Sequence, residues 1–188
     1  LQRDYGCYGH EPKGLWLHAV CVAAGSRALA KACRLGLDES EQLFVAGLLH
    51  DIGKLLLVPY LAEVARSRKP DETICALEQR TIGLDHSEAG ALVTAKWNLA
   101  ADIQDVIKAH HDADAANQPS RSVAIVRLAD AVAHERGTGY LPGLAPAVQL
   151  QDADLAAVGL TRDSWLATRD ALAATMDEAV AALANLSS

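Results

Sequence analysis

Apolar residues recur at the three- and four-residue spacing of an α-helix in almost every segment of this chain. In residues 101–111, for example, Ile103, Val106, Ile107 and His110 share one helical face. The alternation of apolar and polar residues that marks a half-buried strand is missing, and glycines and prolines fall between the periodic stretches. The spacing therefore predicts an all-α fold in which amphipathic helices pack into a bundle.

Capping residues and helix breakers set the expected helix limits. The first helix is expected over residues 15–33, and the sequence Asp38-Glu39-Ser40-Glu41, which resembles a capping box, is expected to open the second. Further helices are predicted to start at Asp71, to span residues 86–97, 101–111 and 121–135, and to run on from a cap at Thr161. Residues 137–146 are expected to be a loop.

The chain is long enough to build a core of its own. With 188 residues it can bury about two-thirds of the surface that its unfolded form exposes, so it needs neither a disulfide nor a metal merely to fold. Any metal site is therefore expected to serve a function. The first residue is not methionine, and residues 1–188 are expected to be a single domain cut from a longer protein.

Charge and cysteine usage exclude several classes of partner and location. Seventeen Lys and Arg against 24 Asp and Glu give a net charge of −7, and no run of five basic residues offers a face for duplex nucleic acid. No stretch of about 18 unbroken apolar residues predicts a membrane span. Cys7, Cys21, Cys33 and Cys75 contain no Cys-x-x-Cys pair and are expected to be small buried side chains of a cytoplasmic protein.

Histidines and aspartates interrupt the predicted apolar faces. His18 lies on the apolar stripe of the first helix, and Asp130 takes a core position of the helix over residues 121–135. Burying such groups unpaired would cost on the order of several kcal/mol, whereas a divalent metal accepts imidazole and carboxylate ligands. The pattern therefore suggests a metal site built from His18, His50, Asp51, His86, His110, His111 and Asp130. A hydrogen-bonded core without metal is the open alternative, and His134 is expected to lie outside the set.

The same residues carry a resemblance to a known family. The order His18, His50-Asp51, Asp130 resembles the H…HD…D signature of the HD superfamily of metal-dependent phosphohydrolases. Five segments resemble the HDOD branch of that superfamily: LWLH (15–18), AGLLHDIGK (46–54), GLDHSEAG (83–90), WNL (97–99) and AHH (109–111). By this resemblance, over about residues 15–160, the chain is identified as a member of the HDOD family. The resemblance implies the helical bundle of HD domains.

The similarity to the related HD-GYP phosphodiesterases implies a ligand set. One divalent metal would take His18, His50, Asp51 and Asp130, and a second would take Asp51, His86, His110 and His111. Asp51 would bridge the two ions. Two cations about 3.5–4 Å apart can activate water and neutralise the charge that grows on a phosphoryl group. The implied metals are iron, manganese, nickel, cobalt or zinc, which a mixed histidine and carboxylate set does not distinguish.

Asp51 and Lys54 are the expected catalytic residues of such a site. Lys54, one helical turn past His50, either contacts a phosphoryl group or is a solvated lysine at a helix end. Three further cationic side chains are candidates for contact with an anionic substrate: Lys96, Lys108 and Arg127.

Two departures from the HD-GYP pattern weaken the inference of catalytic activity. After the double histidine that family continues with Glu-x-x-Asp-Gly-x-Gly-Tyr-Pro, whereas residues 112–119 read DADAANQP. The later sequence Gly139-Tyr140-Leu141-Pro142 follows Asp130 and is expected to be an ordinary loop. Gly14 stands where some HD-GYP members place an additional carboxylate, so a third metal is not expected.

Two functions follow from these observations. The favoured hypothesis is a bacterial-type signal-transduction or regulatory HDOD output domain that keeps the full ligand set. The alternative is an active metal-dependent phosphohydrolase or phosphodiesterase acting on a nucleotide or another phosphoester. The implied partners are regulatory proteins or other domains of the full-length chain. The terminal helix around Trp165 and Leu172 either packs on its own domain or pairs with a second copy in a homodimer.

Overall fold

The computed structural model of the chain describes residues 6–11, 13–61, 68–69, 72–112, 118–141, 146 and 150–186. The predicted all-α fold is confirmed, because these residues form helices and no strand beyond an isolated bridge between His10 and Tyr140. A short 3-10 helix, Gly6–Tyr8, is followed by α1 (Gly14–Ala32), α2 (Leu37–Leu49), α3 (Lys54–Leu61), α4 (Ile74–Ile82), α5 (His86–Lys96), α6 (Ala101–Ala109), α7 (Arg121–Glu135), α8 (Asp152–Ala157) and α9 (Arg162–Leu186).

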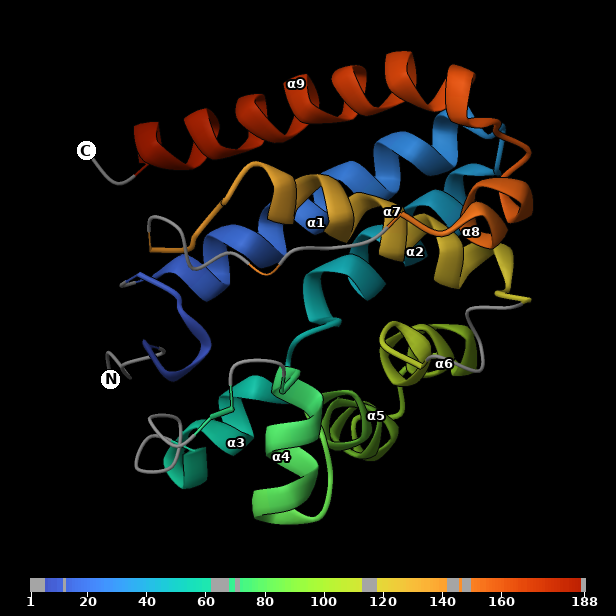
Figure 1. Ribbon diagram of the computed structural model, residues 1–188. Helices are drawn as coiled ribbons and strands as arrows, with labels where there is room; N and C mark the ends of the chain where they lie inside the picture. The colour runs from blue at the N-terminus through green and yellow to red at the C-terminus, as the bar shows by residue number, and fades with distance from the viewer. Residues whose placement is uncertain are drawn as a thin grey trace.

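Helix α1 is the central element of the bundle. It packs against α2, α7 and α9, and α9 runs along one side of the molecule in Figure 1. Helices α3, α4 and α5 lie on the opposite side, where α5 packs against α6 (Figure 1). Helix α6 in turn contacts α2 and α7. This arrangement brings the end of α2, the start of α5 and the end of α6 toward α1 and α7.

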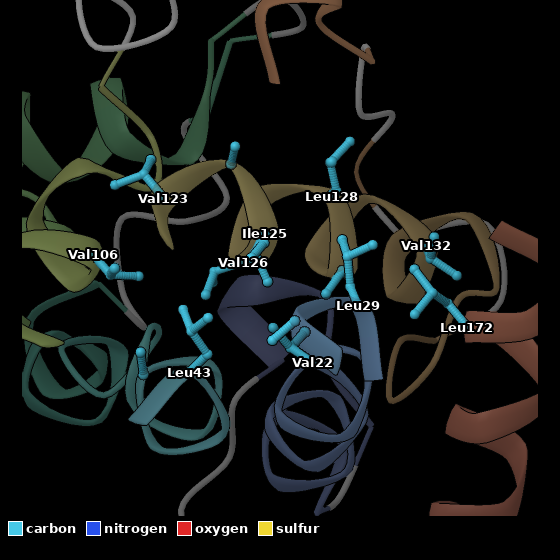
Figure 2. Packing of buried hydrophobic residues seen from close by; sticks show 14 of the residues in the cluster. Val22, Leu29, Leu43, Val106, Val123, Ile125, Val126, Leu128, Val132 and Leu172 are labelled. Carbon is cyan, nitrogen blue, oxygen red and sulfur yellow. The ribbon is translucent and has the colours of Figure 1, made fainter. Parts of the chain in front are cut away.

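The larger hydrophobic core joins α1, α2, α6, α7 and α9, and Figure 2 shows their side chains meeting in one cluster. Val22 and Leu29 of α1 are fully buried in it, as are Ile125 and Val126 of α7. Each such side chain stabilises the fold by about 1.5–3 kcal/mol. Trp165, Leu172 and Met176 of α9 are buried in the same cluster, so the terminal helix packs on its own domain.

The helix starts refine the predicted caps. Helix α2 begins two residues after Leu35, with Gly36 as its N-cap, and Glu39 Oε2 accepts a hydrogen bond of 3.0 Å from the Gly36 N–H. The capping box is therefore centred two residues earlier than the predicted start at Asp38. Helix α4 is capped by Thr73, whose Oγ1 accepts from the Ala76 N–H at 3.1 Å. The predicted start at Asp71 lies outside the described residues.

Two helices were not predicted. Helix α3 is almost uniformly apolar and contains Pro59, so it lacks the polar face on which helical periodicity depends. Helix α8 has only six residues, which is too short to produce a repeat. The prediction for the cysteines is also refined, since no disulfide joins the four described cysteines and only Cys21 is buried.

Gly47 allows α1 and α2 to approach closely. A Cβ atom at this position would lie 2.9 Å from both Ser26 Oγ and Val22 O. Those distances are too short for a side chain larger than hydrogen, so the contact depends on glycine. The close approach brings His50, at the end of α2, near the face of α1 that carries His18.

One described stretch, Leu37–Leu61, is long and apolar enough to pass a test for a membrane span, which the sequence analysis did not predict. In the fold the stretch consists of α2 and α3 joined by a turn, and half of its most apolar window is buried inside the protein. Asp51 and Lys54 lie in its middle and are buried. Core helices of water-exposed domains pass the same test, and a buried charged pair is costly in a lipid-facing helix.

Candidate metal centre

The structure brings together all seven predicted ligands. His18 comes from α1, His50 and Asp51 from the turn after α2, and His86 from the first residue of α5. The others follow α6 or lie on α7: His110, His111 and Asp130. The ligand atoms of Asp51, His86, His110 and His111 lie within 4.8 Å of one another, and those of His18, His50 and Asp130 form a second group by the same measure.

Asp51 lies between the two groups. Its Oδ1 atom is 3.3 Å from His86 Nε2 and 3.7 Å from His110 Nε2. Its Oδ2 atom is 3.4 Å from His50 Nε2 and 3.9 Å from His18 Nε2. One carboxylate thus presents one oxygen to each group, which is the placement that a bridging ligand requires.

Asp130 completes the group on the α1 side. Its Oδ1 atom is 3.0 Å from His18 Nε2 and 3.7 Å from His50 Nε2. Burial opposes ionisation of Asp130, but the adjacent rings of His134 and His18 hold the pKa of its carboxyl well below the usual value. Asp51 behaves similarly, because Lys54 and His50 outweigh the effect of burial. Both carboxylates are therefore negatively charged at neutral pH.

The histidine rings are oriented by hydrogen bonds from Nδ1. His50 Nδ1 donates to Gly47 O at 2.7 Å and His110 Nδ1 donates to Ile107 O at 2.6 Å. A carbonyl oxygen only accepts, so Nδ1 carries a proton and Nε2 is the nitrogen that would bind a metal. Burial lowers the pKa of His18 to about 4 despite Asp130, so this ring is neutral at pH 7.

Several polar atoms of the two groups are buried without a hydrogen-bond partner among the described residues. They are Nε2 of His18, His86 and His110, Oδ1 of Asp51 and Oδ1 of Asp130. Lone pairs of nitrogen and oxygen that face one another at 3–4 Å repel, and each unsatisfied buried group costs on the order of 1–3 kcal/mol. A divalent cation between them would remove both penalties, so the donor set fits the metal ions that the resemblance implies.

The turn that carries His50 and Asp51 is held against the start of α5 by glycine. A Cβ atom on Gly53 would lie 1.9 Å from the carbonyl oxygen of His86. The close contact is therefore available only to glycine at this position. It brings Asp51 and His86 within reach of each other, and Asp85 and Glu88 cap α5 in a capping box that fixes the position of His86.

Lys54 is part of the centre and is not a solvated lysine at a helix end. Its side chain is buried, and Nζ donates to Asp51 Oδ2 at 2.6 Å. Burial disfavours the ammonium, but Asp51 more than compensates and raises the pKa of Lys54. The other three candidate cations do not join it. Lys96 and Lys108 are exposed, and Arg127 lies 3.5 Å from Asp154 Oδ2 of α8.

Three residues near the centre were not identified as part of it from the sequence. His134 lies one turn after Asp130, with Nε2 3.2 Å from Asp130 Oδ1 and its ring 4.8 Å from that of His18. His134 thus lies beside the centre, although it belongs to neither group of ligand atoms, and its i, i+4 spacing from Asp130 is the sequence signal for this position. The rings of His10 and Tyr140 lie 4.1 Å apart, and both are within 6 Å of the His18 ring.

The loop that contains Tyr140 is thus more than a connector. His10 Nδ1 donates to Gly139 O at 3.1 Å, and the Leu141 N–H donates to Gly9 O at 2.8 Å. These contacts tie the N-terminal segment to the turn after α7 beside the centre. On the other side His111 is exposed, although its ring lies 4.2 Å from that of His110, so this ring is the one ligand candidate open to solvent.

Comparison with known proteins identifies the family. The HDOD domain family matches residues 2–113. An HDOD domain protein of unknown function from Geobacter sulfurreducens has a TM-score of 0.68 and 24% identity, over 90% of this chain and 61% of that one. A candidate signal transduction protein from Marinobacter aquaeolei VT8 has a TM-score of 0.71 and 23% identity, over 91% and 38%. A candidate phosphohydrolase from Shewanella amazonensis SB2B has a TM-score of 0.59 and 22% identity, over 91% and 58%.

These solved structures share the fold, and this chain spans between 38% and 61% of their lengths. No curated protein sequence matches the chain. The family match covers more than half of the 188 residues and includes His18, the His50-Asp51 pair, His86 and the His110-His111 pair, while Asp130 lies beyond it. The chain belongs to the HDOD domain family.

Proposed function

We propose that this chain is a signal-transduction or regulatory domain built around a centre for two divalent metal ions. The observation that carries the proposal is the set of buried Nε2 and carboxylate atoms that face one another without hydrogen-bond partners among the described residues. Asp51 belongs to one group of ligand atoms and turns its other oxygen toward the second group, which supports two ions with Asp51 between them. The HDOD family and the signal transduction protein of similar fold support the regulatory role.

Each of the two ions would have its own set of ligands. His18, His50 and Asp130 would hold one ion with Asp51 Oδ2, and His86, His110 and His111 would hold the other with Asp51 Oδ1. When bound, the ions would supply positive charge and would polarise water or a phosphoryl oxygen. The ions would hold together the five segments that contribute these residues. The structural effect of metal or ligand binding would therefore reach the domains that contact the bundle.

The reduced set of cations near the centre favours regulation over catalysis. Among the four candidates from the sequence, Lys54 alone is buried at the centre, and its ammonium is paired with Asp51. An enzyme that cleaves phosphoesters needs donors directed at the phosphoryl oxygens. The regulatory role would be exercised through other domains of the full-length protein or through separate regulatory partners.

A phosphohydrolase is the second candidate, and a specific observation favours it. The buried Lys54 ammonium contacts Asp51, and the exposed His111 adds a solvent-facing imidazole to the group that contains Asp51. A nucleotide or other phosphoester would approach from the His111 side, and Lys54 would have to leave Asp51 to reach it. The candidate phosphohydrolase of similar fold from Shewanella amazonensis lends this alternative some support.

One experiment separates these readings. Protein is purified without chelator and without a nickel column, its metal content is measured, and hydrolysis of bis(p-nitrophenyl) phosphate is assayed with added Mn²⁺ or Fe²⁺. We expect about two metal ions per chain and a large loss of metal in Asp51→Ala. Turnover that depends on Asp51 would make the protein an enzyme, whereas two metals without turnover on a panel of phosphoesters would support the regulatory role. If the protein takes up no metal, the buried histidines and aspartates form a hydrogen-bonded core without metal.

A further inference from the structure

His86 differs from the other oriented histidines in the group that accepts its Nδ1 proton. His50 and His110 donate to the neutral carbonyls of Gly47 and Ile107, whereas His86 Nδ1 donates to Glu78 Oε2 at 2.7 Å. A carboxylate behind a ligating histidine makes the ring more basic and holds its orientation more firmly than a carbonyl does. The two groups of ligands therefore differ in the hydrogen-bond acceptors that orient their histidines.

Glu78 is held in place for this role by its own hydrogen bonds. It is fully buried in α4, and Oε2 also accepts from the backbone N–H of His86 at 2.9 Å. Oε1 accepts from the Tyr8 hydroxyl at 2.8 Å. Burial raises the pKa of Tyr8, so the phenol keeps its proton and continues to donate. Two of these contacts join Glu78 Oε2 to His86, and the Tyr8 hydroxyl holds the other oxygen of the carboxylate in place.

The same carboxylate could be mistaken for part of a separate metal site. Ligand atoms of Cys75, Glu78 and His86 also lie within 4.8 Å of one another. However, both oxygens of Glu78 and Nδ1 of His86 already have hydrogen-bond partners. Glu78 and His86 Nδ1 therefore offer no unsatisfied atom to a further cation, and Glu78 instead supports the centre from behind His86.

On the α1 side, an ammonium and an imidazole lie against the carboxylates that would bind an ion. Lys54 Nζ lies 2.6 Å from Asp51 Oδ2, the oxygen that faces His50 and His18. His134 Nε2 lies 3.2 Å from Asp130 Oδ1. Of the two carboxylate oxygens that would bind an ion there, Asp51 Oδ2 thus already accepts from an ammonium, and Asp130 Oδ1 has beside it a ring nitrogen that belongs to neither group of ligand atoms. His18 Nδ1 has no partner among the described residues, so nothing there fixes the tautomer of that ring.

From these contacts we propose that the two metal positions are unequal, and that the position made by Asp51, His86, His110 and His111 binds a divalent ion more tightly and fills first. Glu78 and Tyr8 are the positioning residues that produce the difference. This inference rests on the proposed metal centre. An ion on the α1 side must compete with Lys54 for Asp51 Oδ2, whereas an ion on the α5 side meets an Asp51 Oδ1 atom that has no hydrogen-bond partner among the described residues.

The first measurement is a titration of metal-free protein with Co²⁺, followed by calorimetry and by the visible absorption of the bound ion. We expect two binding events whose Kd values differ by at least about tenfold. In His110→Ala the tighter event should be lost, and in His18→Ala the weaker one. Two events of equal affinity in the unmodified protein, or loss of the tighter event in His18→Ala, would overturn the inference and leave the metal centre itself intact.

The second measurement tests the positioning residues. Glu78→Gln keeps the shape of the side chain and removes its charge, so it should weaken the tighter event by about 10–100-fold, change the absorption of the first bound Co²⁺ and leave the weaker event unchanged. Tyr8→Phe should weaken the same event to a smaller degree. Glu41→Gln removes the same charge from an exposed position on α2, so it is the control and should change neither event.

The outcomes distinguish positioning from a general structural role. If Glu78→Gln and Tyr8→Phe weaken both events equally, or neither, Glu78 does not favour one position and the inference is wrong. If Glu78→Gln does not fold, the milder Tyr8→Phe variant still decides, because its effect must fall on the tighter event alone. If the unmodified protein binds no Co²⁺, the proposed metal centre fails together with this inference.

Discussion

At the scale of single residues, the Asp51–Lys54 pair is the buried contact with the clearest energetic consequence. Lys54→Met keeps the length of the side chain and leaves the Asp51 carboxylate without its cation. In the metal-free protein we expect a loss of about 3–5 kcal/mol in the free energy of unfolding, because an unpaired buried charge remains. With saturating Mn²⁺ the loss should shrink, since the metal then compensates the charge. Urea unfolding in EDTA and in Mn²⁺ measures both values.

The control for this prediction is Lys108→Met, which removes an exposed lysine of α6. Its effect on the free energy of unfolding should be small and independent of metal. An equal loss for Lys54→Met with and without Mn²⁺ would mean that metal and ammonium do not compensate the same carboxylate.

Gly53 gives a second prediction at this scale. In Gly53→Ala the new methyl group would meet the His86 carbonyl oxygen at 1.9 Å, so the turn and α5 must separate. We expect a destabilisation of about 1–3 kcal/mol together with weaker metal binding, because His86 moves away from Asp51. Urea unfolding and metal analysis measure the two effects. Gly36→Ala, where the nearest atom would be 3.5 Å away, is the matched control and should retain full metal binding.

The identity of the buried polar residues could be predicted from sequence because each one interrupts an apolar stripe. His18 and Asp130 are examples, since their positions on a helical face do not depend on the rest of the fold. His10 and Tyr140 could not be found in this way. His10 bonds to a carbonyl 129 residues away, and no local pattern encodes such a contact.

At the scale of helices, local sequence predicted the long amphipathic elements well and the short ones poorly. Helix α7 matches its predicted limits, residues 121–135, because Ser120 caps it and its apolar spacing is regular. Helix α3 is buried against α4 and α5 through Leu57, Val58 and Leu61, so it has little need of a polar face. Tertiary packing, which the sequence pattern does not contain, therefore decides its helical state.

The contact between α7 and α8 leads to a pH-dependent prediction. Burial raises the pKa of Asp154, and Arg127 at 3.5 Å offsets this only in part. The folded state therefore binds the Asp154 proton more strongly than the unfolded state does. This contribution to stability is fully present below the unfolded pKa and is lost as the pH rises through the folded value.

Asp154→Asn cannot titrate, so its stability relative to the unmodified protein should increase as the pH is raised from about 4 to about 7. Urea unfolding of both proteins at intervals over this range measures the difference. Asp152→Asn, an exposed change on the same helix, should show a much smaller trend. A relative stability of Asp154→Asn that falls with rising pH would mean that the ion pair with Arg127 outweighs burial.

At the scale of the whole molecule, the candidate centre joins parts of the bundle that the hydrophobic core joins less directly. The larger cluster links α1, α2, α6, α7 and α9, whereas α3, α4 and α5 contribute to a separate, smaller cluster. Asp51 lies in the turn between the two sets, and His86 begins α5. Ions bound on both sides of Asp51 would therefore connect the two clusters, which gives the centre a structural effect in addition to its chemistry.

This connection predicts that metal binding raises the thermal stability of the entire chain. At a free metal concentration of about 100 times Kd, binding to the folded state alone stabilises by about 2.7 kcal/mol. For a domain of this size each kcal/mol corresponds to roughly 2–4 °C in Tm, so we expect an increase of about 5–11 °C when Mn²⁺ replaces EDTA. Asp51→Ala should lose this increase, because the shared ligand is gone. If the ions connect the two clusters, metal binding should increase hydrogen-exchange protection in both α5 and α1. An increase confined to one of these helices would argue against the connection.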